Sequence, residues 1–392
     1  MKILMLLESE FPPDRRVENE ISALSEAGHE VHLACFTRKN RQREELFGDA
    51  VIHRMPIRIF TYKSSVASLK FPFYFRFWRR FISSLISNQI FDVVHVHDLP
   101  LCMIGSEIKN IYNIPLIIDL HENWPGLLRV SPHTKTLLGR LLCNIDEWEN
   151  YEKRYVRIAD KVIVVVREAA ERLMKLSIPE QKIEIVSNTI NIKDFHTIPK
   201  TWKMSPGKKI MIYEGGITFH RGIQYVLKAL AKLGSGASDV EFWIVGSGKY
   251  QEKLGNLSDE LHLNDVVRFL GWQPQEKVYE LISNADIAVI PHIKSSHTDN
   301  TIPHKLFHYM YAGLPILASD CAPMVRIINE TSAGHTYKYD NTDELANKIK
   351  LLLNRESFSK PTNGKEWVMK KYNWDIDKLR LIDTYNQLGK KT

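Results

Sequence analysis

The sequence predicts an α/β protein built from two doubly wound parallel-sheet domains. Its 392 residues are too many for one ordinary hydrophobic core, so two domains are expected. Short runs rich in β-branched residues alternate with helical patterns, first over residues 1–188 and again over 209–320. Continuous apolar strands joined by helices are typical of parallel sheets covered on both faces. Such sheets bind ligands at the carboxyl ends of their strands, so the loops after strands are the candidate functional segments.

The alternation stops at residues 189–208, a polar stretch that contains two prolines. We place the interdomain linker there. A last strong helical pattern follows Trp374, and its pattern alone does not assign it to either domain. The predicted organisation is an N-terminal domain over residues 1–195, a linker over 196–207, a C-terminal domain over 208–372 and a terminal helix over 373–392.

The composition is that of a soluble globular protein, with 44% hydrophobic and 25% charged residues. No segment approaches the roughly 18 consecutive apolar residues that span a bilayer. The first seven residues run into Glu8 without a cleavage site, which favours a strand over a signal peptide. The four cysteines lack metal-ligand spacing, which suits a reducing compartment, so a cytoplasmic location is expected. The net charge of +7 indicates anionic partners without identifying them.

A glycine-bearing turn at residues 213–222 is the first candidate phosphate site. A strand ends in Gly215 and Gly216, and a helix is expected to start near Arg221. Glycines let backbone amides approach a ligand closely, and a helix N-terminus offers unpaired N–H groups. The guanidinium of Arg221 adds a planar donor fork that suits a diphosphate. The alternative is an ordinary strand-to-helix turn with a surface arginine.

Two further glycine turns follow strands in the second half of the chain. One contains Gly246, and the other contains Gly271 followed by Trp272. None of the turns matches the dinucleotide fingerprint or the P-loop, which argues against nicotinamide and ordinary NTPase functions. Trp272 could flank a nucleobase, although partial burial in the core is the more common role of a single tryptophan.

The run at residues 300–320 carries the strongest signal. Asn300, Thr301 and Ile302 come just before Pro303, which suits the first position of a helix. Lys305 would then place a positive charge in the first turn, where a purely structural helix prefers an acid. This arrangement predicts an anion site.

The helix is expected to continue to Gly313 with one face in the core. That face leaves His304, Lys305 and His308 to reach a ligand. Nearby histidines lack a cysteine and lie partly on different loops, so no metal site is expected. The residues expected to face the core are Leu306, Phe307 and Met310.

These motifs resemble family-4 retaining glycosyltransferases of the GT-B fold across essentially the whole chain. The resemblance implies two Rossmann-like domains facing a central cleft, with a UDP- or GDP-sugar donor in the C-terminal domain and an acceptor mainly in the N-terminal one. It also implies retention at the anomeric carbon, no metal or other cofactor, and a terminal helix that crosses back to the N-terminal domain. The only DxD, Asp375 and Asp377, is expected to form a solvated face of that helix. The segments that carry the resemblance are FPPDRRVENEISALSEAGHEV, DVVHVHDLP, IIDLHENWP, ADKVIVVVREAAERL, VSNTINIKDF, YEGGITFHRG and NTIPHKLFHYMYAGLPILASD.

The resemblance also assigns residues in the first half. His121 matches a histidine near the transferred sugar, and His97 and Asp98 match a segment that faces the acceptor, although packing in the core is an alternative for His97. Asp14 and Arg16 match the loop after the first strand. Arg16 could reach a phosphate from there, whereas a solvated helix N-terminus explains Asp14 equally well.

Three sets of site residues are therefore predicted, with no metal ligand. The catalytic residues are His121, Arg221 and Lys305. The donor-binding residues are Arg16, Gly215, Gly216, Gly246, Trp272, Asn300, Thr301, Ile302 and His308. The acceptor-side residues are Asp14, His97 and Asp98.

Two features depart from the family pattern. The family often carries two glutamates eight positions apart, the second of which binds ribose hydroxyls, and here these positions are Asn300 and His308. An imidazole replaces a bidentate acceptor, so donor affinity or nucleotide choice is affected. The family arginine of the glycine loop is Gly216, which leaves Arg221 to act with Lys305 or Arg16 on the diphosphate.

A basic stretch in the first half predicts contact with an anionic membrane. No acidic residue occurs between Asp49 and Asp92, and aromatic residues alternate there with arginines. A core stripe beside a solvated basic face is the alternative. Nucleic-acid-binding modules are absent, so no nucleic acid partner is expected. The predicted membrane patch consists of Arg76, Trp78, Arg79 and Arg80.

The sequence thus favours a hexosyltransferase-type retaining glycosyltransferase of cell-surface polysaccharide or glycoconjugate synthesis. Its acceptor would be a glycan or a lipid-linked carrier, and the protein would be cytoplasmic or peripheral at the inner face of the cell membrane. A degenerate GT-B protein, which binds a nucleotide sugar or a partner transferase without catalysis, is the alternative.

Overall fold

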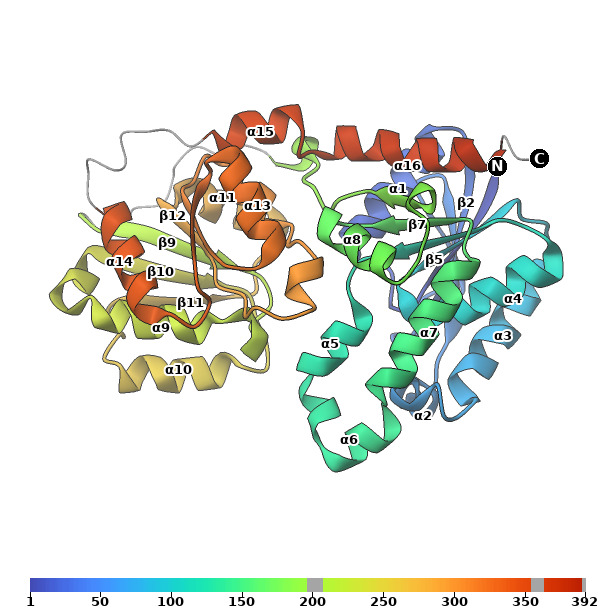
Figure 1. Cartoon of the computed structure of the whole chain (residues 1–392), viewed down its shortest axis with the longest axis horizontal. Coiled ribbons are helices and arrows are strands. Elements are labelled where there is room, and N and C mark those ends of the chain that lie inside the picture. Colours follow the sequence, from blue (N-terminus) through green and yellow to red (C-terminus); the bar gives the residue numbers. More distant parts are fainter. Residues whose placement is uncertain (196–206, 354–362, 390–392) are drawn as a thin grey trace. The chain divides into compact units, whose positions relative to one another are not determined.

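Figure 1 shows the computed structural model of the chain, which describes residues 1–195, 207–353 and 363–389. The chain divides into two compact units. The first unit consists of Met1–Ser187 together with the residues from Asp377 onward, and the second of Asn188–Ile376. Nearly all of the linker predicted over 196–207 lies outside the described residues.

The division between the units falls upstream of that predicted linker, because residues after Ser187 bond to the second unit. Ile190 forms a parallel bridge with Asn373. The backbone N–H of Trp374 donates to the carbonyl oxygen of Ile190 at 2.8 Å. These bonds join the segment that enters the second unit to the segment that leaves it.

The first unit contains an eight-stranded sheet in the order β3-β4-β2-β1-β5-β6-β7-β8. All neighbours are parallel except β3 and β4. The strands are β1 (Lys2–Leu7), β2 (Glu30–Thr37), β3 (Glu44–Phe47), β4 (Ala50–Pro56), β5 (Val93–His97), β6 (Leu116–Leu120), β7 (Lys161–Val164) and β8 (Ile183–Ile185). The α-helices are α1 (Arg15–Glu26), α2 (Ile59–Lys63), α3 (Phe73–Ile86), α4 (Cys102–Tyr112), α5 (Trp124–Val130), α6 (Leu137–Leu142), α7 (Ile145–Ile158) and α8 (Arg167–Lys175). Short 3₁₀ turns are η1 (Ser64–Ala67), η2 (Leu99–Leu101), η3 (Pro132–Lys135) and η4 (Glu180–Lys182).

The terminal helix α16 (Trp374–Gly389) belongs largely to the first unit. Its Tyr385 is fully buried, and the hydroxyl oxygen lies 2.6 Å from Nδ1 of His95 on β5. The solvated face that we expected for the DxD pair is wrong for Asp377, which is 1% exposed and pairs with Arg380 at 2.9 Å. Because the helix packs on the sheet, one of the two aspartates has to face inward.

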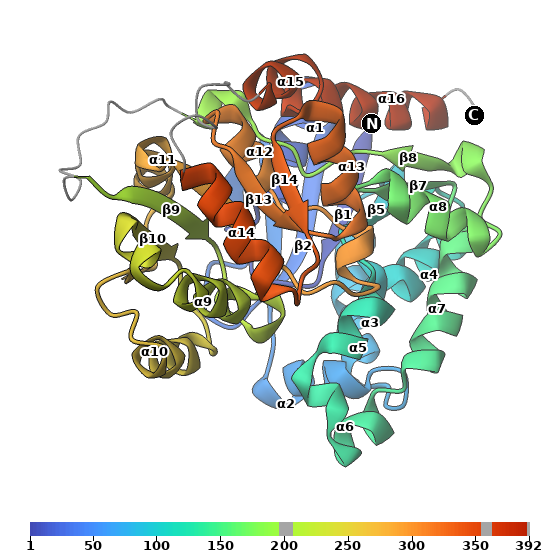
Figure 2. The ribbon, with the colours of Figure 1, turned by 60° about the vertical axis from the view of Figure 1, so that its left-hand side comes forward.

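The second unit contains a six-stranded, entirely parallel sheet in the order β11-β10-β9-β12-β13-β14. Helices lie on both faces of this sheet (Figure 2). The strands are β9 (Lys209–Glu214), β10 (Val240–Val245), β11 (Val267–Gly271), β12 (Ile287–Ile290), β13 (Ile316–Ser319) and β14 (Gly334–Tyr337). The helices are α9 (Ile223–Lys232), α10 (Gln251–Glu260), α11 (Gln275–Asn284), α12 (Lys305–Tyr311), α13 (Ala322–Thr331), α14 (Thr342–Leu353) and α15 (Gly364–Lys370), with 3₁₀ turns η5 (Ile192–Asp194), η6 (Phe219–Arg221), η7 (Gly234–Asp239) and η8 (Thr298–Asn300).

The two sheets confirm the predicted doubly wound α/β architecture. In the first unit the chain reverses direction across the sheet between β1 and β5, and in the second between β9 and β12. Ligands of open α/β sheets bind at such switch points, outside the carboxyl ends of the strands. No helix among the described residues is long and apolar enough to cross a membrane.

Gly222 illustrates how the second unit positions its loops. It lies between η6 and α9 with a φ of +74°, and a Cβ atom built on it would lie 1.7 Å from the carbonyl oxygen of Pro291. We expect Gly222→Ala to lower the free energy of unfolding by about 3 kcal/mol or more, because it adds both a left-handed backbone strain and a clash with main chain. Urea denaturation would measure the loss.

Gly255→Ala is the matched control for this substitution. Gly255 lies inside α10, and no atom lies within 4 Å of its built Cβ position. The alanine should stabilise the protein by about 0.5–1 kcal/mol through helix propensity. Equal effects of the two substitutions would contradict the close approach at Gly222.

Candidate functional site

The switch point of the second unit holds a loop of glycines packed against a neighbouring loop. Gly215, directly after β9, has a φ of +122°, and its N–H donates to the carbonyl oxygen of Val245 at 2.9 Å. A Cβ atom on Gly246, after β10, would lie 2.0 Å from the carbonyl oxygen of Gly215. Gly246 therefore has a packing role, while Gly216 is exposed and free of such contacts. Contact of these glycines with a donor stays a prediction.

Arg221 ends η6 just before α9, close to the predicted helix start. Its guanidinium Nη1 lies 3.1 Å from Nε2 of His292, which follows β12 and is 3% exposed. Burial, together with the nearby charge of Arg221, holds the pKa of His292 well below its usual value. The imidazole is therefore neutral, and Nε2 accepts a hydrogen bond from Arg221. His292 fixes the arginine, a positioning role that the sequence did not indicate.

Lys305 is buried and its ammonium group faces the glycine loop. The Nζ atom donates to the backbone carbonyl of Glu214, lies 3.9 Å from the centre of the Tyr213 ring, and would be 2.7 Å from a Cβ on Gly215. Burial and, to a smaller extent, the charge of Arg221 lower the pKa of Lys305 to about 7, although the carboxylate of Glu214 opposes the shift. Lys305 and Arg221 thus place two cationic side chains at one loop.

The carboxylate of Glu214 is a site group that sequence reasoning missed. Its Oε1 lies 3.4 Å from Nδ1 of His308 on α12. Burial alone would raise its pKa, but the hydrogen bond with His308 and the charge of Lys305 lower the pKa to about 2. The available signal was its place as the last residue of β9, directly before the glycines of YEGG. A carboxylate therefore lies beside His308, although position 308 itself carries none.

The start of α12 differs from the prediction. The helix begins at Lys305 rather than at Pro303, because the preceding turn uses i→i+3 hydrogen bonds from Leu306 to Pro303 and from Phe307 to His304. The core face is confirmed, since the side chains of Leu306, Phe307 and Met310 are fully buried.

The segment before α12 offers less side-chain contact than predicted. Ile302 is 2% exposed, so its side chain belongs to the core and only its backbone can meet a ligand. The amide nitrogen of Asn300 donates to the carbonyl oxygen of Ser296 at 2.7 Å, while Thr301 is partly exposed. Trp272 is 73% exposed after β11, which excludes the core-packing alternative and leaves nucleobase stacking as a prediction.

In the first unit, Arg16 on α1 forms a buried bidentate ion pair with Asp119 on β6. Its Nε and Nη2 atoms each lie 2.8 Å from an oxygen of that carboxylate. Nε also lies 3.0 Å from Glu20, and Nη1 donates to the carbonyl oxygen of Val186 at 2.9 Å. The prediction that Arg16 reaches a donor phosphate is therefore wrong: its side chain is 4% exposed and bonded inside the unit.

His121 is held between two carboxylates. Its Nδ1 lies 3.3 Å from Asp98, and its Nε2 lies 3.1 Å from Asp119. Burial alone would lower its pKa, but these two charges raise the pKa of His121 to about 10. The ring is therefore a protonated imidazolium at neutral pH. Its side chain remains 16% exposed, so its positive charge borders solvent.

Two acceptor-side predictions need correction. His97 is fully buried and burial lowers its pKa, so it supports His121, with Nδ1 3.2 Å from that ring, and cannot touch an acceptor. Asp14 caps α1 by accepting the backbone N–H of Val17 at 3.2 Å, as its alternative explanation proposed. Asp98 keeps a side chain that is 26% exposed.

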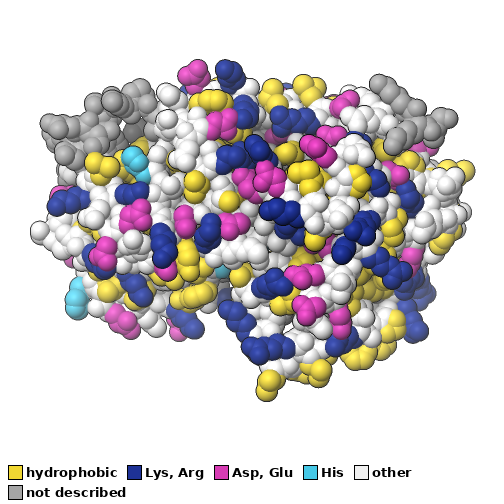
Figure 3. All heavy atoms as spheres, viewed as in Figure 1, with side chains coloured by type: hydrophobic (Ala, Val, Ile, Leu, Met, Phe, Trp, Pro, Cys, Tyr) yellow, Lys and Arg dark blue, Asp and Glu magenta, His cyan; other side chains and the backbone are white. Residues whose placement is uncertain are grey.

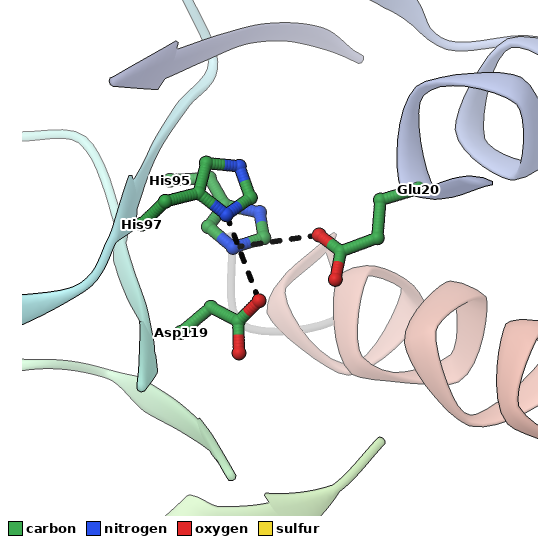
Figure 4. Close-up of side chains that lie close together, drawn as sticks. All are labelled: Glu20, His95, His97 and Asp119. Carbon is green, nitrogen blue, oxygen red and sulfur yellow. Dashed lines mark ion pairs between the residues drawn. The ribbon is translucent and has the colours of Figure 1, made fainter. Parts of the chain in front are cut away.

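Glu20, His95, His97 and Asp119 point toward one another in the core of the first unit (Figure 4). One ligand-type atom from each lies within 4.8 Å of the others, as in a metal site. However, the guanidinium of Arg16 already contacts both carboxylates, and burial raises the pKa of Glu20 well above its usual value. The cluster therefore has a built-in cation, and the expected independence of a metal stays a prediction.

The predicted membrane patch is only partly on the surface. Trp78 is fully buried, with its ring centre 6.4 Å from that of Tyr74, because it belongs to the core stripe of α3. Arg79 forms a bidentate ion pair with Glu107 at 2.6 and 2.7 Å. Arg76 and Arg80 are exposed. The membrane assignment of Trp78 is therefore wrong.

Two family models match nearly the whole chain. The model described as Glycosyltransferase Family 4 matches residues 14–194, and the model described as Glycosyl transferases group 1 matches residues 194–366. An uncharacterized glycosyltransferase of Methanocaldococcus jannaschii is 23% identical over 336 residues, which cover 80% of this chain and 81% of that protein.

Solved structures agree in fold. The sucrose-phosphate synthase of Thermosynechococcus elongatus superposes with a TM-score of 0.79 at 18% identity and covers 100% of both chains. The Anabaena HepE protein in complex with UDP-glucose superposes with a TM-score of 0.70 at 14% identity, over 99% of this chain and 100% of that one. These neighbours have two parallel-sheet domains of the GT-B fold.

The ion pair of Arg16 gives a prediction on stability. We expect Asp119→Asn to lower the free energy of unfolding by about 3–5 kcal/mol, because it leaves a buried guanidinium without its bidentate partner. Asp343→Asn is the control, since that carboxylate is 76% exposed and pairs with Lys232, and it should change stability by less than about 1 kcal/mol. Urea denaturation of both variants measures the difference.

The same structure predicts a pH dependence. Because the folded protein raises the pKa of His121, its stabilising contribution is fully present below the unfolded histidine pKa of about 6.5. That contribution should be lost as the pH rises toward about 10. NMR titration of the His121 ring checks the value, and a ring that titrates near 6.5 in the native protein would contradict the imidazolium.

Proposed function

This chain belongs to glycosyltransferase family 4 and has the GT-B fold, and on that premise we propose that it moves a sugar from a nucleotide diphospho-sugar to a glycan or lipid-linked acceptor. The transferred sugar keeps its anomeric configuration. The reaction is of the hexosyltransferase type and serves cell-surface polysaccharide or glycoconjugate synthesis. We place the protein in the cytoplasm.

The proposal rests chiefly on the two cations at the glycine loop. Arg221 and Lys305 come from different elements, yet both reach the switch point of the second sheet. Neither has a carboxylate as a direct ion-pair partner in the described residues, as His292 is neutral and Lys305 donates to a backbone oxygen. Two such cations suit a diphosphate leaving group, whose charge grows as the bond to the sugar breaks.

The nucleoside end of the donor is assigned to the neighbouring groups. We place the ribose hydroxyls beside His308, with the carboxylate of Glu214 supplying the acceptor that position 308 lacks. Trp272 is exposed enough to stack on the base. UDP and GDP both fit this description.

In the proposed reaction the acceptor oxygen attacks the anomeric carbon from the same face from which the leaving group departs. The bond from that carbon to the phosphate oxygen breaks as the bond to the acceptor oxygen forms. The departing phosphate takes the proton of the acceptor hydroxyl, so atoms and charge balance without a metal ion. The residues assigned to the leaving group are Arg221 and Lys305. His121 provides a positive charge in the first unit, to which the acceptor is assigned.

A degenerate GT-B protein remains the second candidate, because Asn300 and His308 replace both family glutamates. Such a protein would bind a nucleotide sugar or a partner transferase without transfer. Calorimetry with UDP and GDP followed by a donor-hydrolysis assay separates the two functions. Binding without hydrolysis or transfer to any offered acceptor would favour the degenerate protein.

Removal of the fixed guanidinium is the direct test of the leaving-group site. We expect Arg221→Ala to reduce turnover about 100-fold or more, because a donor to the developing diphosphate charge is lost. Arg268→Ala is the control: this arginine is 47% exposed and its Nη1 donates to the carbonyl oxygen of Asn264. Near wild-type turnover of Arg221→Ala would refute the assignment.

The lowered pKa of Lys305 predicts proton uptake on binding. At pH 8 the amine is largely neutral, since its pKa is about 7, and an adjacent diphosphate should raise that pKa and draw in a proton. Calorimetry of UDP in buffers of different ionisation enthalpy should therefore show uptake of up to about one proton. Lys305→Met should abolish the uptake and Lys294→Met, which removes an exposed amine paired with Asp299, should not.

A further inference from the structure

Two segments of the first unit contain no acidic residue. They are residues 50–91 and 123–145, which are separated by β5, α4 and β6. Lysines and arginines occur throughout both segments. Together they are Arg54, Arg58, Lys63, Lys70, Arg76, Arg79, Arg80, Arg129, Lys135 and Arg140.

The fold brings these two segments to the same end of the first unit. The first segment supplies α2 and the start of α3, and the second supplies α5, η3 and α6. In both ribbon views α2 and α6 lie at the lower end of this unit, below the sheet (Figures 1 and 2). Two acid-free segments that are far apart in the sequence therefore lie at one end of the unit, where the nearest carboxylates are those of α7, and Glu147 and Glu149 there pair with Lys70 and Arg129.

Large apolar side chains protrude from this end. On α6, Leu137, Leu138 and Leu141 are 87%, 64% and 65% exposed, and their spacing places them on one helix face. Around α2 and α3, Phe60 and Phe73 are 66% and 43% exposed and their ring centres are 5.6 Å apart. Single exposed apolar residues are ordinary, whereas a group of this kind marks a binding surface. We name these five residues the apolar tip.

Cations flank the apolar tip without being neutralised by the protein. Figure 3 shows hydrophobic side chains along the lower margin of the first unit, with lysines and arginines on the adjoining surface. In the described parts of the chain, none of the following exposed side chains has an ion-pair partner: Arg58, Lys63, Arg76, Arg80, Lys135 and Arg140.

We propose that the apolar tip inserts into the headgroup region of an anionic lipid bilayer while the flanking cations contact lipid phosphates. Leucine and phenylalanine suit the boundary between headgroups and acyl chains, and each lysine or arginine near an anionic surface adds about 1 kcal/mol of attraction. Because the two segments carry lysines and arginines and no acidic residue, their charge is complementary to that of anionic lipid headgroups. The surface replaces the patch around Trp78, and the proposal does not depend on sugar transfer.

Vesicle sedimentation of the full chain tests the proposal. The wild type should bind vesicles that contain phosphatidylglycerol at least tenfold better than vesicles of phosphatidylcholine alone, and added salt should weaken the binding because it screens the phosphates. The triple variant Leu137→Ser/Leu138→Ser/Leu141→Ser should lose at least tenfold in partitioning. The charge variant Lys135→Glu/Arg140→Glu should lose binding to the anionic vesicles by a similar factor.

The control variant is Ile111→Ser/Leu379→Ser, which removes apolar side chains that are 71% and 60% exposed on α4 and α16 of the same unit. It should bind vesicles as the wild type does. Equal losses in the control and the triple variant, or no binding of the wild type to anionic vesicles at low salt, would overturn the proposal. A triple variant that binds vesicles normally but loses self-association, measured by sedimentation velocity, would assign the tip to a second copy of the chain instead.

A failure of this proposal is distinguishable from a failure of the proposed function. Vesicle binding needs no donor, and donor hydrolysis in solution needs no membrane. The triple variant should therefore keep wild-type hydrolysis of a nucleotide sugar. An inactive wild type that still binds anionic vesicles would refute the transferase and leave the membrane surface intact.

Discussion

The buried ion pair of Arg16 and Asp119 organises the first unit. Two charges without solvent are stable only when their hydrogen-bonding groups have partners, and here the bidentate pair with Asp119 and the carbonyl oxygen of Val186 satisfy the guanidinium, with Glu20 close by. The pair joins α1 to β6 and leaves Asp119 in place to hold His121. The positive charge of that histidine follows from two carboxylates, Asp98 and the same Asp119 that pairs with Arg16.

The second unit also buries a cation, but this cation has no carboxylate as a direct ion-pair partner among the described residues. Its buried cation, Lys305, faces a backbone carbonyl and an aromatic ring instead of a dedicated carboxylate, so its pKa falls to about 7. Arg221 is fixed by a neutral imidazole. Charge in the first unit is neutralised internally, whereas charge in the second unit is left for a ligand. This contrast supports the assignment of the donor to the second unit and of a positioning network to the first.

The end of the first unit that carries the apolar tip adds a surface property to this division. Trp78 on α3 is buried in the core. Leucines on α6 and phenylalanines on α2 and at the start of α3 are exposed beside unpaired cations. The apolar tip contains none of the residues assigned to the donor or to the network around His121, so lipid binding and transfer can be changed by separate substitutions.

The sequence by itself determined the two doubly wound sheets, the core face of α12 and the glycine turns that follow β9, β10 and β11, because these depend on hydrophobic periodicity and glycine placement along short stretches of chain. It also identified Arg221, Lys305 and His308 as candidate residues. The tertiary structure decided which charges are neutralised: that Arg16 is bonded to Asp119, that His97 is buried, and that Glu214 lies beside His308. It also decided that Trp78 belongs to the core and that α6 joins α2 at one end. Such facts depend on contacts between residues far apart in the chain, which local patterns do not encode.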